Sequence, residues 1–154
     1  MNATTRGALN AYAKVEVDAG TNNASPHKLI LMLFEGAQTA VAAARVNMLL
    51  KNVAQRGQAI SKAIAIIDEG LKLSLDEKAG GELAQNLKAL YEYMCHRLLL
   101  ANLHNNLPAL DEVSKLLGDL KSAWEAIAPQ AQVAQSAVAQ QSAPQRAAMS
   151  YGKA

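Results

Sequence analysis

This chain of 154 residues contains little cysteine and few aromatic residues, and it has no large excess of positive or negative charge. Cys95 is the only cysteine, so no disulfide can form within one chain, which suits a reducing compartment such as the cytosol. The aromatic residues are one Trp, one Phe and four Tyr. The chain is nevertheless 51% apolar, and Ala and Leu supply most of that share. Both are strong helix formers, so the composition indicates an all-α protein.

A surplus of charge and a targeting segment are also lacking. Lys and Arg number 15 against 13 Asp and Glu, and the surplus of two comes from Arg146 and Lys153. Without a basic stripe, nucleic-acid binding has little electrostatic support. The N-terminus lacks the apolar core of a signal peptide, and the longest apolar run is shorter than the ~20 residues that span a bilayer. We expect a cytoplasmic protein that binds no nucleic acid and does not insert stably into membranes.

Helical periodicity predicts four helices between residues 25 and 128. Ser25 is a favoured N-cap for the first helix, and Pro26 suits its first position. The second helix covers about 55–73, the third about 82–105, and the fourth runs from Pro108 to Pro129. Short connections predict an antiparallel up-down four-helix bundle. The expected core stripes, helix by helix, are Ile30, Leu33, Ala37, Val41, Ala44 and Met48; Ile60, Ala63, Ile64, Ile67 and Leu71; Leu83, Leu87, Leu90, Met94, Leu98 and Ala101; and Leu110, Val113, Leu117, Leu120, Trp124 and Ile127.

The two ends of the chain differ from this middle part. Residues 1–24 contain an apolar piece followed by the flexible stretch GTNNA. Residues 129–154 contain eight Ala and six Gln but no acidic residue. Such a composition cannot form a core of its own, so we expect a disordered or partly helical tail. The predicted organisation is an N-terminal cap segment (1–24), a helical bundle (25–128) and an Ala/Gln-rich tail (129–154).

The first helix carries more apolar surface than one core can bury. Residues 29–34, LILMLF, are apolar without a break, whereas a surface helix needs a stripe only about 100° wide. At about 100° per residue, a second stripe without charge lies opposite the core stripe. Its members are Met32, Gly36, Thr39, Ala43, Val46 and Leu50. On the third helix, Leu99 and Leu103 also point away from the core, beside His96.

Three kinds of partner can cover this surplus surface. Residues 1–24 can fold across it with Leu9, Tyr12, Val15 and Val17. A second copy of the chain can bind there, or a client polypeptide can lie in the groove, since exposed apolar patches often mark interaction sites. The residues alone leave these three open, and a removable N-terminal segment can alternate with a client.

No residue pattern in the chain indicates catalysis or metal binding. The three histidines lack the Glu-x-x-His pairs of bundle metal sites, and Glu92 and His96 read as a solvated pair. Cys95 lies on the flank of a core stripe without an activating base, so we expect a buried thiol. Arg97 lies where an ion pair with a neighbouring helix is expected. The paired glycines in AGGELA lack the rest of a phosphate-binding loop. We therefore expect no catalytic residue, metal or cofactor.

Four segments of the sequence resemble a known protein family. ASPHKLILMLFEGA, KAIAIIDEGLKLSLD, GGELAQNLKALYEYMCHRLLLANLHNN and EVSKLLGDLKSAW resemble, in order and spacing, the FliS family of flagellar export chaperones. The most specific part is the pattern Leu90, Tyr91, Tyr93, Met94, Arg97, Leu98, Ala101 and Asn102.

The resemblance implies a function that periodicity does not give. It implies an antiparallel helix bundle that binds the C-terminal segment of flagellin in the cytoplasm, prevents premature polymerisation and assists delivery to the export gate protein FlhA. It also implies an N-terminal segment whose tyrosine, here Tyr12, can lie over the client groove. The tail after Pro129 is not part of the family pattern. The expected client-binding or cap residues are Tyr12, Met32, Gly36, Ala43, Val46, Leu50, Leu99 and Leu103.

Two other classes of protein remain as alternatives. A helical adaptor or regulator of another export or assembly system would have the same bundle without affinity for flagellin. A small-molecule enzyme would need an internal polar pocket, and the stripes offer almost no titratable residues for one. A monomer or a weak dimer is compatible with the sequence.

Overall fold

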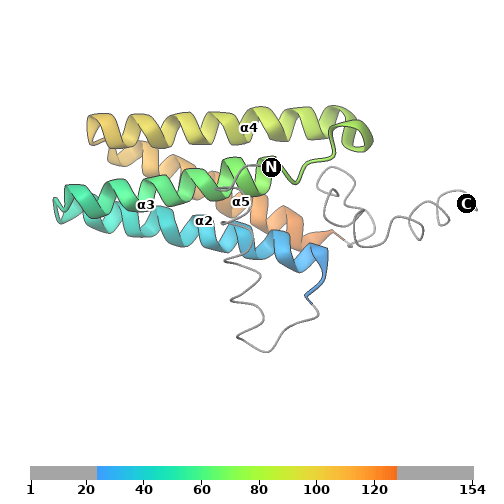
Figure 1. The fold of residues 1–154 in the computed structure, drawn as a ribbon, viewed down its shortest axis with the longest axis horizontal. Helices are drawn as coiled ribbons and strands as arrows, with labels where there is room; N and C mark the ends of the chain where they lie inside the picture. Colours follow the sequence, from blue (N-terminus) through green and yellow to red (C-terminus); the bar gives the residue numbers. More distant parts are fainter. Residues whose placement is uncertain (1–23, 128–154) are drawn as a thin grey trace, which may run out of the picture.

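The computed structural model describes residues 24–127, and in this range the chain forms helices and no strands. The helices are α2 (Pro26–Leu49), α3 (Val53–Ala65), the π-helix η1 (Ile66–Lys72) that continues α3, α4 (Glu77–His104) and α5 (Leu107–Ala126). Consecutive rods run in opposite directions (Figure 1). The prediction of an all-α bundle is confirmed. The cap segment (apart from Ala24) and the tail lie outside the described residues, so that division stays a prediction.

Side-chain caps explain where three of the helices begin. The Ser25 hydroxyl accepts a hydrogen bond from the Lys28 amide (3.1 Å), and Pro26 follows it, as predicted. Asp76 accepts from the Ala79 amide at the start of α4, and Asn106 caps α5 in the same way. Each cap supplies a partner for an amide that lacks one inside its helix.

The start of α4 differs from the prediction. The helix begins at Glu77 rather than near Glu82, because Asp76 caps a first turn inside the expected turn region. Gly81 then interrupts the helix with φ 56° and ψ −134°, a conformation that glycine adopts without strain. The glycine pair therefore marks a break inside α4 rather than the end of a connection.

The helices are arranged so that α2 and α4 occupy opposite corners of the bundle. α2 packs against α3, η1 and α5, and α4 packs against α3, η1 and α5 from the other side. Figure 1 shows α4 along the top and α2 below it, with α3 in front and α5 behind. Surfaces on the outer sides of α2 and α4 are consequently separated by α3 or α5.

The core confirms the predicted stripe of α2 and corrects that of α4. All six predicted α2 positions are buried, together with Phe34 and Ala40. On α4, Leu83 is 59% exposed, whereas Ala84 and Tyr91 are fully buried. The buried face is thus shifted from the predicted one at the start of α4, just after the break at Gly81. Ile127, the last predicted core residue, is 39% exposed because α5 has already ended.

The length and composition of α2 are also those of a helix that can cross a membrane. The core helix of a soluble protein meets the same criterion. Eight residues of α2 are buried in the bundle, so its apolar character has a structural explanation without a membrane.

The residues that follow α3 form the π-helix η1, whereas the periodicity predicted one continuous α-helix over both segments. Ile66, Ile67, Gly70 and Leu71 of η1 are all buried. A Cβ atom placed on Gly70 would lie 3.1 Å from Leu33 Cδ2, closer than ordinary van der Waals contact. The absence of a side chain at residue 70 therefore allows η1 to approach α2 closely.

This contact makes two glycines respond differently to the same substitution. Gly57→Ala places a methyl group in α3 at an ordinary contact distance, 4.0 Å from Asn102 Nδ2, so it should raise the free energy of unfolding by about 0.5–1 kcal/mol. Gly70→Ala forces Leu33 to move, so the free energy of unfolding of this variant should be lower than that of Gly57→Ala by ~1 kcal/mol or more. Chemical denaturation of both variants measures the difference, and equal changes would contradict the close approach.

Candidate functional site

The outer stripe of α2 lies where the sequence predicted, on the side away from the core. Val46 is 54% exposed and Leu50 is 64% exposed, and Ala43 and Thr39 are exposed as well. Met32 and Gly36, nearer the start of the helix, are half-buried. The apolar surface of α2 is thus most accessible toward its C-terminal end.

The exposed surface continues across the turn between α2 and α3. Leu49 is 57% exposed and Val53 is 62% exposed, and the connecting Lys51 has a positive φ of 62°. We call Val46, Leu49, Leu50 and Val53 the turn patch. Leu49 and Val53 were not among the predicted site residues, because Leu49 is on neither stripe of the helix and Val53 lies in the predicted connection.

A second apolar surface lies on the C-terminal part of α4. Leu99 is 58% exposed and Leu103 is 73% exposed, with exposed His96 one turn earlier. Both leucines lie next to Asn102 on the helix surface, and Asn102 faces α3 through its hydrogen bond with Arg56. The leucine pair therefore borders the α3–α4 seam.

Arg56 joins the helices that carry these two surfaces. Its Nε donates to Asn102 Oδ1 (2.9 Å), its Nη1 to Asn105 Oδ1 (2.9 Å) and its Nη2 to the Asn102 carbonyl (3.1 Å). The planar guanidinium is suited to such multiple bonds. The start of α3 is thus fixed against the end of α4, so the turn patch and the leucine pair lie at the same end of the bundle (Figure 1).

The structure groups the predicted site residues by position along the bundle. Val46 and Leu50 lie at the same end as Leu99 and Leu103, but on different corners. Met32 and Gly36 lie toward the opposite end of α2. Tyr12 is outside the described residues. These residues therefore do not form one compact pocket, and the arrangement suits an extended partner that follows the outside of the bundle.

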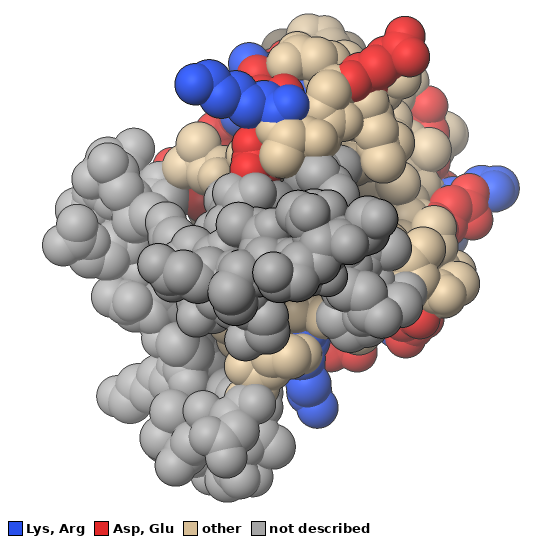
Figure 2. Space-filling view, turned by 90° about the vertical axis from the view of Figure 1, so that its right-hand side faces the viewer, with Lys and Arg blue, Asp and Glu red and all other residues tan. Residues whose placement is uncertain are grey.

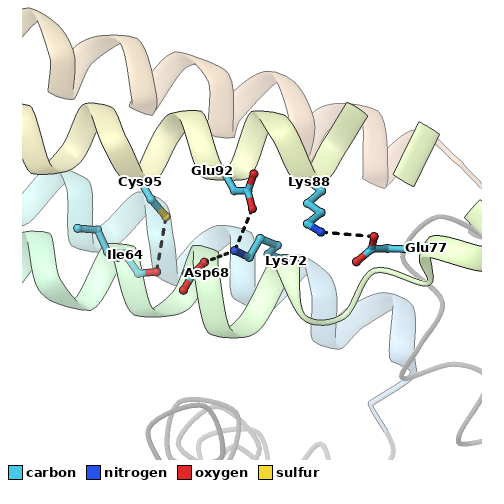
Figure 3. Close-up of polar contacts among 7 residues, drawn as sticks. All are labelled: Ile64, Asp68, Lys72, Glu77, Lys88, Glu92 and Cys95. Carbon is cyan, nitrogen blue, oxygen red and sulfur yellow. Dashed lines mark hydrogen bonds and ion pairs between the residues drawn. The ribbon is translucent and has the colours of Figure 1, made fainter. Parts of the chain in front are cut away.

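Glu92 and Cys95 take part in contacts between helices. Glu92 pairs with Lys72 of η1 (3.3 Å), which also pairs with Asp68 (2.7 Å), rather than forming the predicted pair with His96 (Figure 3). The hydrogen bond with Asp68 raises the pKa of Lys72. Cys95 is half-buried and its thiol lies 3.9 Å from the Ile64 carbonyl.

Burial makes Cys95 a poor nucleophile. It raises the pKa of the thiol to about 12, so the sulfur stays protonated at neutral pH. Among the described residues, no group of three His, Cys, Asp or Glu side chains is placed to hold a metal ion. In the view of Figure 2, described acidic and basic side chains lie among each other at the surface.

The predicted ion pair of Arg97 is confirmed, and it belongs to a network between α4 and α5. Glu112 accepts hydrogen bonds from the Tyr93 hydroxyl and from Arg97 Nε, both at 2.6 Å. These bonds, first that of Tyr93 and then that of Arg97, lower the pKa of Glu112, and the same contact raises the pKa of Tyr93. These side-chain contacts thus join α4 and α5 at this point.

Comparison with known proteins identifies the family. The family model described as flagellar protein FliS matches residues 8–131. The chain belongs to the FliS family. It is 48% identical over 132 residues to the flagellar secretion chaperone FliS of Salmonella typhimurium, covering 86% of this chain and 98% of that protein.

Two further relatives bear the same name. Identity is 44% over 115 residues to the flagellar secretion chaperone FliS of Escherichia coli (75% of this chain, 85% of that protein). It is 32% over 104 residues to that of Bacillus subtilis (68% and 76%). This FliS family member thus shares most of its bundle with proteins named as chaperones, and residues after 131 lie beyond the family match.

The Glu112 network predicts a specific dependence on pH. A carboxyl group whose pKa is lowered in the folded state contributes stability above its unfolded pKa, about 4.3, and this contribution is lost as the pH falls through the folded value. Tyr93→Phe removes the hydrogen bond that lowers the pKa of Glu112 most, so this pKa should rise toward its ordinary value.

Carbon-detected NMR titration of the Glu112 carboxyl measures this directly. The stability difference between wild type and Tyr93→Phe should be present at neutral pH and shrink below pH ~4. Identical titration curves in the two proteins would contradict the assigned role of the tyrosine.

Proposed function

We propose that this protein is a cytoplasmic flagellar export chaperone that binds the C-terminal segment of flagellin. Membership of the FliS family, with relatives named as flagellar secretion chaperones, supports the general role. The exposed apolar stripe of α2 and the turn patch support binding of a polypeptide. The observation that carries the proposal is that α2 buries eight residues in the core and still presents Val46 and Leu50 to solvent.

The client segment binds by placing apolar side chains against surfaces that are separated on the bundle. A segment that is disordered when free loses conformational entropy when it binds, so affinity depends on a few apolar anchors and on a long contact. While these side chains are covered by the chaperone, they are unavailable to other flagellin subunits, which prevents premature polymerisation. The complex is then delivered to the export gate protein FlhA.

The N-terminal segment acts as a removable cover in this proposal. Residues around Tyr12 lie over part of the outer surface of α2 in the free protein and leave when the client binds. The cover and the client use the same apolar surface, so only one of them occupies it at a time. The chaperone itself is a monomer or a weak dimer.

Titration calorimetry with a flagellin C-terminal peptide tests the α2 surface. Ala43→Glu places a charge in the middle of the exposed stripe, so burial against the client becomes costly and the Kd should rise at least tenfold, or about 1.4 kcal/mol. Ala89→Glu is the matched control, because Ala89 is exposed on the outer side of α4 away from both apolar surfaces.

Circular dichroism first establishes that both variants fold. Undiminished binding by a folded Ala43→Glu variant would exclude the α2 stripe from the client site. Equal weakening by both variants would attribute the effect to net charge instead.

Hydrogen exchange tests the cover. Amides in residues 8–20 should exchange faster after the flagellin peptide is added, because the client displaces this segment. Tyr12→Ala should reduce the protection of this segment in the free protein. Increased protection of residues 8–20 on client binding would contradict displacement.

A further inference from the structure

Side-chain contacts join α4 and α5 at one end of the bundle, which we call the closed end, and the two helices diverge toward the other end. At the closed end, Arg97 and Tyr93 of α4 bind Glu112 of α5. At the far end of α5, Trp124 contacts α2 instead. Its ring stacks on His27 with centroids 5.1 Å apart, and its indole N–H donates to the His27 carbonyl (3.0 Å). Figure 1 accordingly shows α5 beside α4 at one end of the bundle and beside the start of α2 at the other.

Leucine side chains line this diverging seam on both helices. Counting back from Arg97 in helical steps gives Leu90, Leu87 and Leu83 on the side of α4 that faces α5. Counting forward from Glu112 gives Leu116 and Leu120 on the side of α5 that faces α4, and Ile127 follows directly after the end of α5 at Ala126. We call these six residues the α4–α5 groove.

Exposure within the groove increases with distance from the closed end. Leu87, Leu90, Leu116 and Leu120 are half-buried and pack against the core. The outermost residues are Leu83, which is 59% exposed, and Ile127, which is 39% exposed. The groove therefore opens at the end of the bundle where α5 ends.

The C-terminal tail follows the end of α5, at the end of the bundle where the groove residues are most exposed. Ile127 is the last described residue, and it follows α5 with an extended backbone (φ −98°, ψ 148°) and a partly exposed side chain. No charged residue occurs between Glu125 and Arg146. Within this uncharged stretch, Ala131, Ala134 and Val138 are spaced so that they would share one small apolar face of a helix. Small side chains permit close packing of a segment between two helices.

The length of the tail is sufficient for it to turn back. Leu83 and Leu90 are seven residues apart, or about 10 Å along a helix, and residues 131–141 would cover about 16 Å as a helix. Pro129 prevents α5 from continuing, so the chain can reverse before residue 131. A tethered segment competes for such a site at an effective concentration in the mM range, which favours it over a separate molecule.

We propose that residues 131–141 of this chain pack as a short helix into the α4–α5 groove. Residues after 131 lie beyond the family match, and the Salmonella typhimurium relative is covered over 98% of its length by 132 aligned residues. This contact is therefore an addition of this chain to the shared bundle. It covers the leucines near the start of α4 and is independent of flagellin binding.

Hydrogen exchange with mass spectrometry on the full chain tests this contact. Peptides covering residues 131–141 should exchange roughly tenfold more slowly than the same sequence unfolded. Val138→Glu places a charge in the apolar face of the tail, and Leu83→Glu places one in the groove. Each should abolish the protection, because a charge is costly to bury.

Two control variants carry the same type of change elsewhere. Ala147→Glu alters the tail outside residues 131–141, and Leu103→Glu alters an exposed leucine at the opposite end of the bundle. Both should leave the protection unchanged. Full exchange of residues 131–141 in the wild-type chain would overturn the proposal. Protection that survives Leu83→Glu would also overturn it, because the tail would then be helical without docking.

A dilution series identifies the occupant. Protection from a tail bound to its own groove is unchanged when the protein is diluted tenfold. Protection that falls on dilution would instead show contact between copies of the chain and would overturn the intramolecular arrangement.

Discussion

The packing of α2 against α3, η1 and α5 is the interaction on which the rest of the structure depends. Eight α2 residues enter the core, and Gly70 of η1 allows close contact with Leu33. Because one face of α2 suffices to join the other helices, its opposite face is not needed for folding. A helix that is apolar on both sides can therefore serve a core and a partner at the same time.

Polar contacts at the two ends of the bundle hold the helices that surround α2. Arg56 connects α3 to α4 with three hydrogen bonds, and His27 and Trp124 connect the start of α2 to the end of α5. The His27 Nε2–H donates to the Trp124 carbonyl (2.9 Å) while the indole donates in return (3.0 Å). These contacts fix the ends without covering the apolar outer faces, which leaves those faces available.

Much of the fold followed from the sequence, because its signals are local. Ser25 with Pro26 marked the start of α2, the spacing of apolar residues located its core face, and Arg97 was expected to pair with a neighbouring helix. The outer stripe was also placed correctly, since one helical wheel determines both faces.

The remaining features depend on contacts between helices that one helix does not encode. The π-helix η1 occurs where Gly70 meets Leu33, and the buried face of α4 includes Ala84 and Tyr91 rather than Leu83. The turn patch needed the actual end of α2 and start of α3 before Leu49 and Val53 could be assigned to it. Sequence periodicity cannot supply these tertiary details.

The central claim is that the outer apolar surface of the bundle holds the C-terminal segment of flagellin. Co-purification from flagellated cells tests it most directly, using the full tagged chain with either complete flagellin or flagellin that lacks its C-terminal segment. The account predicts that complete flagellin co-purifies with the chain and that the truncated form does not. Equal recovery of both forms, or recovery of neither, would contradict it.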